Sequence, residues 1–500
     1  MTPADSTSRL SLSEKTLLLV TQRTLGRFLA IITTALLVRL FTEELYGTYR
    51  QLTMIGSLCL VFCGFALPGS LMYFIPNATT LAEKRHFTGQ TVVLLGVAGV
   101  LVLVGLMAGA GWLSTRFNNP HLTTALRVYA LWIGCSVAAQ YFVQLMYALE
   151  RIGPAIVYNL LGTQIAQIGL LAAAFYFRLG LLPYLWCLVG LEAIKAVVAL
   201  IVTWRFLGGL AWQPSREMLG RQLGYSAPLA VAQAVNRLSY DIDLLVVSST
   251  YAMQEFAFYA VGAFELPLVS ILRKTSATIS KPRLVKLYRE QRVEEVLGLF
   301  REVVRKISVI AMPCFVFLFV MAESFIRVLY TDAYLPSVPI FRVYLLLIPL
   351  SCAAFNTLIQ TTGRTRPVMV LSVLYIVLSI PLNFVFIQWF GLIGPAIATV
   401  LCKMGLATAQ LRVVTQRYQR PLRDIYPFMQ VGTILIVSAM AIVPVALVTR
   451  LIPNPLAQLV AAVSLGVPVC VIVFWRCRIL RDADLAPLRK WLRILLPLQS

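Results

Sequence analysis

The sequence is poor in charged residues. Asp, Glu, Lys and Arg together make up 13% of its 500 residues, whereas soluble domains carry about 25%. Hydrophobic residues account for 59% of the chain and the mean hydropathy is +0.81. A surface with so little charge cannot keep a chain of this length in solution. The composition therefore predicts a protein that crosses a membrane several times.

Residues that several kinds of chemistry require are also scarce. The two histidines, His86 and His121, and the lack of a Cys-x-x-Cys motif argue against a zinc site. No P-loop motif is present, so the chain carries no ATPase of this type of its own. The nine cysteines lie mostly in apolar runs and resemble small hydrophobic residues more than disulfide partners. We therefore expect no metal, no cofactor and no catalytic residue.

Long apolar runs dominate the chain. A membrane-spanning helix needs about 20 mostly apolar residues. Cutting such runs at charged, proline and glycine clusters gives fourteen candidate spans: 16–41, 50–75, 90–112, 123–147, 154–176, 181–204, 224–249, 255–273, 308–330, 338–361, 367–388, 391–411, 427–449 and 455–475.

The positions of lysine and arginine orient these spans, because cytoplasmic loops hold an excess of basic residues. With the N-terminus in the cytoplasm, the outside loops contain only Arg116, Arg178, Arg327 and Arg450 of the 43 lysines and arginines. Both termini are therefore predicted to be cytoplasmic. The net charge of +22 is then mostly a signal of topology. Nucleic-acid binding is disfavoured, because the basic residues are spread over many loops.

Two cytoplasmic segments alternate apolar and basic residues at helical spacing. One covers residues 284–306 and the other lies in the C-terminal tail, at residues 485–495. Both patterns are typical of helices that lie in the plane of the lipid headgroups.

A weak internal repeat has an offset of about 210 residues. Arg27 in the first span corresponds to Arg237 in the seventh, and residues 151–154 correspond to 364–367. The repeat predicts a first lobe of six spans at 1–211 and a second at 212–417, followed by residues 418–500 with two extra spans and the amphipathic tail. An even number of spans per lobe makes the repeats parallel, with a central cavity between them.

Fourteen spans arranged as six, six and two resemble the multidrug/oligosaccharidyl-lipid/polysaccharide exporter superfamily. The resemblance is greatest to its polysaccharide branch, the Wzx-type flippases of lipid-linked oligosaccharides. Four stretches carry it, at 44–49, 64–68, 363–367 and 391–399. It implies an all-α integral membrane fold, a bacterial inner membrane, and a lipid-linked oligosaccharide as substrate. It also implies that a polymerase and glycosyltransferases of the same pathway are partners.

Several charged residues fall inside the spans. Each costs about 2.5–3.5 kcal/mol at bilayer depth, so such residues usually face a cavity or pair with one another. The basic residues suit an anionic headgroup, because guanidinium and ammonium groups bind phosphate. They are Arg23, Arg27, Lys195, Arg237 and Lys403. The acidic residues are candidates for ion or proton coupling, and they are Glu192, Asp241, Asp243 and Glu265.

These charges can also be explained without a substrate site, by contact with lipid headgroups or by pairing with one another. Arg23 is close enough to the cytoplasmic end of its span to reach the headgroups. Glu192 and Lys195 are three residues apart, and Arg237 and Asp241 are four apart, so each pair could serve only to neutralise itself.

The sequence thus predicts a transporter that flips a polyprenyl-pyrophosphate oligosaccharide from the cytoplasmic to the outer leaflet by alternating access. Without an ATPase motif, the work comes from an ion gradient or from consumption of the product outside. Three alternatives remain. They are an exporter of drugs or cations, a flippase for the peptidoglycan lipid precursor, and a polytopic glycosyltransferase or polymerase. The enzyme is disfavoured because no outside loop is long enough for a catalytic site.

Overall fold

The structure is a computed structural model, and it describes residues 12–212, 215–264, 267–353, 355–362 and 366–479. These residues are almost entirely helical and contain no strand, which confirms the predicted all-α class. The chain folds into two compact units, residues 1–260 and 261–500. The lobe boundary at 211/212 concerns the sequence repeat, and it stays a prediction.

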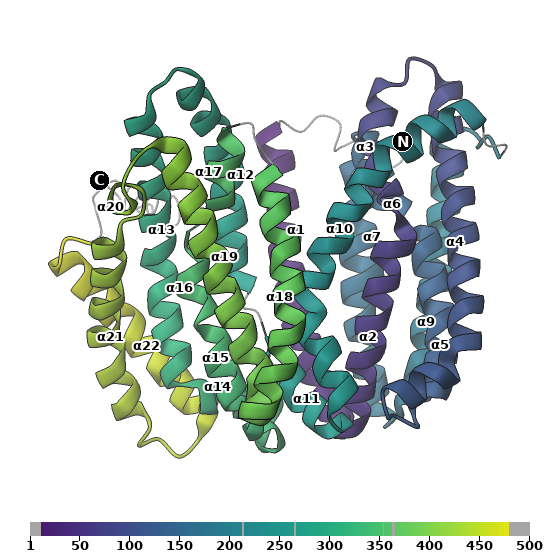
Figure 1. Ribbon diagram of the computed structural model, residues 1–500. Helices are drawn as coiled ribbons and strands as arrows, with labels where there is room; N and C mark the ends of the chain where they lie inside the picture. The colour runs from purple at the N-terminus through teal and green to yellow at the C-terminus, as the bar shows by residue number, and fades with distance from the viewer. Residues whose placement is uncertain (1–11, 213–214, 265–266, 354, 363–365, 480–500) are drawn as a thin grey trace, which may run out of the picture. The chain divides into compact units, whose positions relative to one another are not determined.

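The first unit is a bundle of long helices joined by short turns. In chain order its elements are α1 (Leu12–Leu40), α2 (Glu43–Gly64), α3 (Leu67–Asn77), α4 (Leu81–Arg116), α5 (Leu122–Ala139), α6 (Tyr141–Ala148), α7 (Ile152–Asn159), the π-helix η2 (Leu160–Ile165), α8 (Ala166–Tyr176), α9 (Leu181–Leu207), α10 (Arg216–Thr250) and α11 (Met253–Gly262), which crosses the unit boundary. Helices α4, α5 and α9 lie side by side (Figure 1).

The second unit has shorter helices between its long ones. Its elements are α12 (Pro267–Arg289), α13 (Val293–Val320), α14 (Ala322–Tyr330), the 3₁₀-helix η3 (Asp332–Ser337), α15 (Val338–Leu345), α16 (Leu347–Ser351), α17 (Phe355–Thr361), α18 (Arg366–Phe390), the 3₁₀-helix η4 (Gly391–Ile393), α19 (Gly394–Tyr418), α20 (Leu422–Ile425), α21 (Phe428–Thr449) and α22 (Pro455–Arg476). Helices α21 and α22 pack against each other (Figure 1).

Local chemistry sets several helix ends. Thr80 caps α4 by accepting a hydrogen bond from the backbone N–H of Glu83, whose carboxylate accepts one from the backbone N–H of Thr79. This reciprocal arrangement satisfies amide groups that the helix start would leave without partners. Phe65 and Ala66 adopt left-handed backbone angles, with φ of 45° and 52°. These angles end α2, and a new helix, α3, begins at Leu67.

Ten helical segments of the described chain are long and apolar enough to cross a membrane. They cover eleven of the predicted spans, because the segment Arg366–Tyr418 contains both α18 and α19. The three other predicted spans coincide with α1, α10 and the pair α11–α12, which carry more charged residues. The chain is therefore a multi-pass membrane protein.

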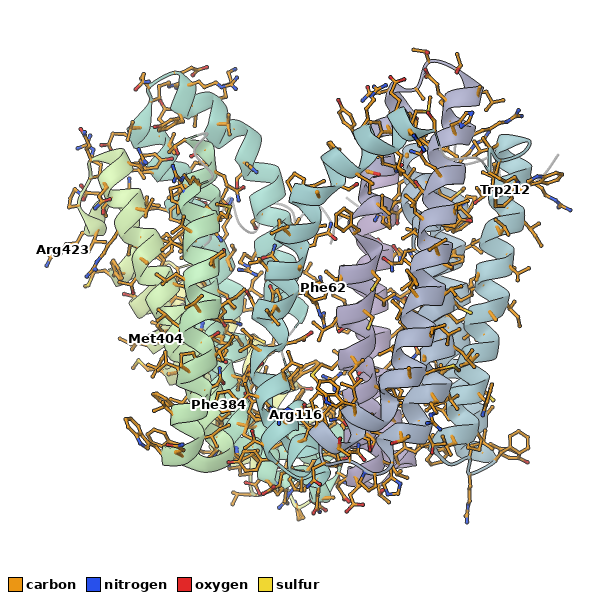
Figure 2. All side chains as sticks on the ribbon, turned by 45° about the vertical axis from the view of Figure 1, so that its right-hand side comes forward. Phe62, Arg116, Trp212, Phe384, Met404 and Arg423 are labelled. Carbon is orange, nitrogen blue, oxygen red and sulfur yellow. The ribbon has the colours of Figure 1, made fainter. Side chains whose placement is uncertain are left out.

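Large apolar side chains project from the middle of the long helices. Phe384 on α18 and Met404 on α19 point outward from their helices (Figure 2), and their side chains are 46% and 45% exposed. On α4, Val100 and Leu101 are exposed as well. Such surfaces are stable in contact with lipid and unstable in water.

A buried polar cluster fixes the start of α10 to the first unit. The Gln222 Nε2 group donates to Ser70 Oγ on α3 and to Thr91 Oγ1 on α4, both at 2.8 Å. Its Oε1 atom accepts from Gln90 Nε2 at 2.6 Å. All four side chains are fully buried. Since these hydrogen bonds have no competing water, they specify how α10 lies on α3 and α4.

The predicted headgroup-plane helix at 284–306 is wrong. Helix α12 ends at Arg289 and α13 begins at Val293, so this segment is a helical hairpin that extends two long helices. Leu287, Leu297 and Phe300 are buried in one cluster with side chains of α17 and α19. The apolar face that suggested lipid contact is covered by protein. The tail at 485–495 lies outside the described residues.

Helices α4 and α5 approach closely at two glycines, which gives a test of this packing. An added Cβ at Gly99 would lie 2.6 Å from the carbonyl oxygen of Gly134. Gly99→Ala is therefore expected to force the helices apart and to cost about 1–3 kcal/mol. At Gly96, on the same helix, an added Cβ would meet nothing within 4 Å.

The melting temperature of the purified protein in detergent measures the difference. We expect Gly99→Ala to melt several degrees below the wild type and Gly96→Ala to melt at or above it. Equal melting temperatures for the two variants would contradict the close approach.

Candidate functional site

A cavity of about 250 Å³ lies inside the first unit, between α2, α5, α9 and the segment η2–α8. Its lining combines aromatic rings, hydroxyl groups, one amide and an ion pair. Concave sites with an apolar wall and a few converging polar groups are the usual form of a small-molecule site.

Helices α2 and α5 form two walls. Tyr49, Thr53 and Ser57 line the cavity from successive turns of α2, because residues four apart share a helix face. Tyr129 and Trp132 line it from α5, with their rings stacked at a centroid distance of 4.8 Å and an interplanar angle of 14°. The cavity is thus lined by aromatic rings from α5 and by hydroxyl groups from α2.

The third wall contains a π-helix, which the sequence pattern does not predict. Thr163 in η2 and Gln167 in α8 line the cavity. The neighbouring Gln164 packs directly on Gly26 of α1, where any larger residue would collide with it. Segments of π-helix inside longer helices occur often at functional sites. No local sequence signal marks this one.

The fourth wall carries a buried ion pair. Lys195 Nζ lies 2.9 Å from Glu192 Oε2 on α9, and each side chain is only 9% exposed. The ammonium group also lies 5.1 Å from the centre of the Tyr158 ring. The pairing predicted from the spacing of three residues is therefore present, and both partners line the cavity.

A second ion pair adjoins the cavity. On α10, Arg237 Nε lies 2.6 Å from Asp241 Oδ2. Arg237 Nη2 donates to Ser57 Oγ at 2.7 Å, so the hydroxyl group that lines the cavity also holds the guanidinium group. The Asp241 side chain is 7% exposed, whereas that of Arg237 is 36% exposed. A partly exposed guanidinium beside a buried carboxylate is oriented by that carboxylate and still accessible to a ligand.

Asp243 occupies a different environment from Asp241. Its Oδ2 atom accepts a hydrogen bond from the Tyr259 hydroxyl at 3.0 Å, and its Oδ1 atom accepts from the backbone N–H of Leu244. Asp243 and Tyr259 are 4% and 0% exposed. This contact joins α10 to α11 and lies within the protein.

The structure does not bring the remaining candidates into this cavity. Arg27 lies on α1 next to Gly26, where α1 packs on η2, and is half-buried. Lys403 is half-buried on α19 in the other unit. The side chain of Arg23 and the whole of Glu265 lie outside the described part of the structure.

The charges of the site separate into two regions. Inside the cavity, Glu192 and Lys195 cancel each other, and beside it Arg237 offers a positive group. Among the described residues, no cluster of His, Cys, Asp or Glu has the arrangement of a metal site. The groups present can bind and orient a polar ligand with an anionic part.

The buried pair on α9 gives a prediction about stability. Glu192→Gln leaves the Lys195 ammonium buried without its carboxylate, which typically costs about 3–5 kcal/mol. Glu192→Gln combined with Lys195→Met removes both charges and is expected to recover most of that loss. Melting temperatures in detergent of both single variants and the double variant provide the comparison. Losses that simply add in the double variant would show that the two side chains do not interact.

Comparisons with known proteins place this fold. A lipid II flippase, MurJ, in an inward closed conformation superposes with a TM-score of 0.72 and 15% sequence identity, covering 92% of this chain and 99% of its own. An inward-facing multidrug resistance MATE family transporter of the MOP superfamily gives a TM-score of 0.59 with 13% identity, covering 79% and 94%. A MOP superfamily transporter from Pyrococcus furiosus gives 0.56 with 14% identity, covering 84% and 98%.

At these identities the structures establish the fold, which is that of the MOP superfamily transporters. No curated protein matches the sequence significantly. A family model described as "Polysaccharide biosynthesis protein" matches residues 36–339, which is more than half of the chain. The protein therefore belongs to the polysaccharide biosynthesis protein family, as the resemblance of its sequence to the polysaccharide flippases implies.

Proposed function

We propose that this protein flips a polyprenyl-pyrophosphate oligosaccharide from the cytoplasmic to the outer leaflet of the inner membrane, with both of its termini in the cytoplasm. The observation that carries the proposal is Arg237, a partly exposed arginine on a helix at a predicted span, oriented by Asp241 and Ser57. An arginine at bilayer depth usually serves a substrate path. Guanidinium binds phosphate oxygens through two parallel hydrogen bonds, so a diphosphate is a fitting ligand.

The proposed transport mechanism is inferred from the sequence repeat and from the charged residues in the spans. The lobes at 1–211 and 212–417 rock to open a central cavity to each side in turn. Arg23, Arg27 and Lys403 add positive charge along the path, and Lys195 contributes a hydrogen-bond donor whose charge Glu192 neutralises. The diphosphate and glycan cross while the lipid tail stays in the bilayer. Transport rather than catalysis is the activity, and a polymerase and glycosyltransferases of the same pathway act on either side of it.

Two related activities compete with this one. The MurJ likeness favours a flippase for lipid II, whose polyprenyl diphosphate would suit Arg237 equally. The MATE likeness favours an exporter of drugs or cations. An acidic cavity would suit a cation better, whereas each carboxylate described at this site is paired with a base, Glu192 with Lys195 and Asp241 with Arg237.

Ion coupling is proposed to run through the acidic residues, with Asp241 first among Asp241, Asp243, Glu192 and Glu265. When a diphosphate takes the guanidinium of Arg237, Asp241 loses part of its partner in a buried position. A buried carboxylate without a cation favours its protonated form. Substrate binding and proton uptake would then be linked.

Substitution of Arg237 tests the substrate site. In liposomes holding a fluorescent polyprenyl-pyrophosphate oligosaccharide, Arg237→Ala is expected to slow flipping about tenfold or more, since hydrogen bonds to charged groups contribute about 1.5–3 kcal/mol. Arg237→Lys keeps the charge but loses the bidentate hydrogen bonding of guanidinium. Its flipping rate should lie between those of the wild type and Arg237→Ala. Arg116→Ala, at the exposed end of α4, serves as the control. Wild-type rates in Arg237→Ala would overturn this role.

Substitution of Asp241 tests the coupling. If Asp241 exchanges its proton during transport, a pH gradient across the liposome changes the flipping rate of the wild type and leaves Asp241→Asn insensitive. The ratio of rates with and without the gradient is the measurement. An unchanged ratio in Asp241→Asn would remove Asp241 from the coupling pathway and leave the flippase proposal intact.

A further inference from the structure

The cavity inside the first unit has features that Arg237 does not explain. Its α5 wall presents Trp132, with the Tyr129 ring stacked on one face of the indole. Trp132 is only half-buried, so part of its indole remains accessible. Flat aromatic surfaces bind the C–H face of a sugar ring, which is apolar, while hydroxyl groups at the ring edge need hydrogen-bond partners.

The other walls provide those partners. Thr53, Thr163 and Gln167 line the cavity with two hydroxyl groups and one amide. The two hydroxyl groups donate to the backbone carbonyls of Arg50 and Tyr158, so they can accept hydrogen bonds from a ligand, and the amide can both donate and accept. The Lys195 ammonium donates one hydrogen bond to Glu192, and both residues reach the cavity. Because the two charges cancel, the cavity suits a neutral ligand with many hydroxyl groups better than an ion.

Size and position narrow the ligand further. A volume of about 250 Å³ is slightly below the range of about 300–1,000 Å³ of sites for drug-sized molecules. It therefore accommodates one sugar ring and not an oligosaccharide. Ser57 lines the cavity and also binds Arg237, so an anion at Arg237 would lie one side chain away from it. In a sugar diphosphate, the first sugar ring is bonded directly to the phosphate.

We propose that this cavity binds one pyranose ring, the sugar next to the diphosphate, stacked on Trp132 and hydrogen-bonded by Gln167 and Thr163. The inference rests on the proposed function only for the identity of the attached diphosphate. Recognition of the substrate then has two parts. Arg237 binds the diphosphate that all such lipids share, and the cavity binds the first sugar ring, which differs between them.

Binding of free sugars tests the proposal without transport. Methyl glycosides of glucose, galactose and N-acetylglucosamine are titrated onto the full chain in lipid nanodiscs, and saturation-transfer NMR reports which protons contact the protein. At least one glycoside is expected to bind the wild type. Trp132→Ala should weaken that binding about tenfold, as expected for loss of an aromatic contact, and Trp132→Phe should retain most of it.

Two further variants complete the test. Gln167→Ala removes a polar partner without opening the aromatic wall, so it should also weaken binding even if Trp132→Ala folds poorly. Trp186→Ala removes a 55% exposed tryptophan of α9 outside the cavity, and it should bind sugar as the wild type does. Absence of binding in the wild type, or equal binding in the wild type, Trp132→Ala and Gln167→Ala, would overturn the proposal.

The outcome is separable from that of the flippase proposal. Sugar binding is measured on protein that is not transporting. A wild type that binds a glycoside but flips no lipid would support the sugar-binding proposal and contradict the flippase proposal. A wild type that flips the lipid-linked oligosaccharide but binds no glycoside would support the flippase proposal and contradict the sugar-binding proposal.

Discussion

Polar side chains inside a membrane protein have to find their partners within the protein, because lipid offers none. In the first unit this constraint selects the arrangement of α10. Gln222 near its start uses its amide on α3 and α4, and Arg237 near its middle uses its guanidinium on Asp241 and on Ser57 of α2. An apolar helix could slide or rotate on its neighbours at little cost. A helix with these anchors has one register.

The same constraint explains the different environments of the charged groups on α10. A charge that only stabilised the bundle would be enclosed on all sides, as Asp243 is by Tyr259 and Leu244. Arg237 is enclosed on one side only, and its partner Asp241 is much more buried than it is. The carboxylate thus supports a guanidinium whose remaining surface is open. The difference in exposure between Arg237 and Asp241 is what leaves this guanidinium accessible to a ligand.

Local sequence patterns predicted the all-α class, the position of most spans and the two ion pairs, since all of these depend on residues within about 20 positions of one another. The contact between Arg237 and Ser57 joins residues 180 positions apart, and no local pattern encodes it. The cavity needs four helices to assemble, so it was not predictable either. The error at 284–306 has a related cause. An amphipathic pattern shows that one face is covered, but it does not show whether lipid or protein covers it.

The π-helix η2 shifts the phase of its span. A π-turn accommodates one more residue than an α-turn, so the faces of α7 and α8 are offset by about 100° relative to a continuous α-helix. Any helical wheel drawn through residues 152–176 therefore assigns Gln167 and its neighbours to the wrong side. Removal of one residue of η2 other than Thr163 would convert the π-turn into a regular α-turn and keep α8 facing the cavity. The same deletion in α7 would leave the π-turn in place and rotate the two flanks of the deletion by about 100° relative to each other.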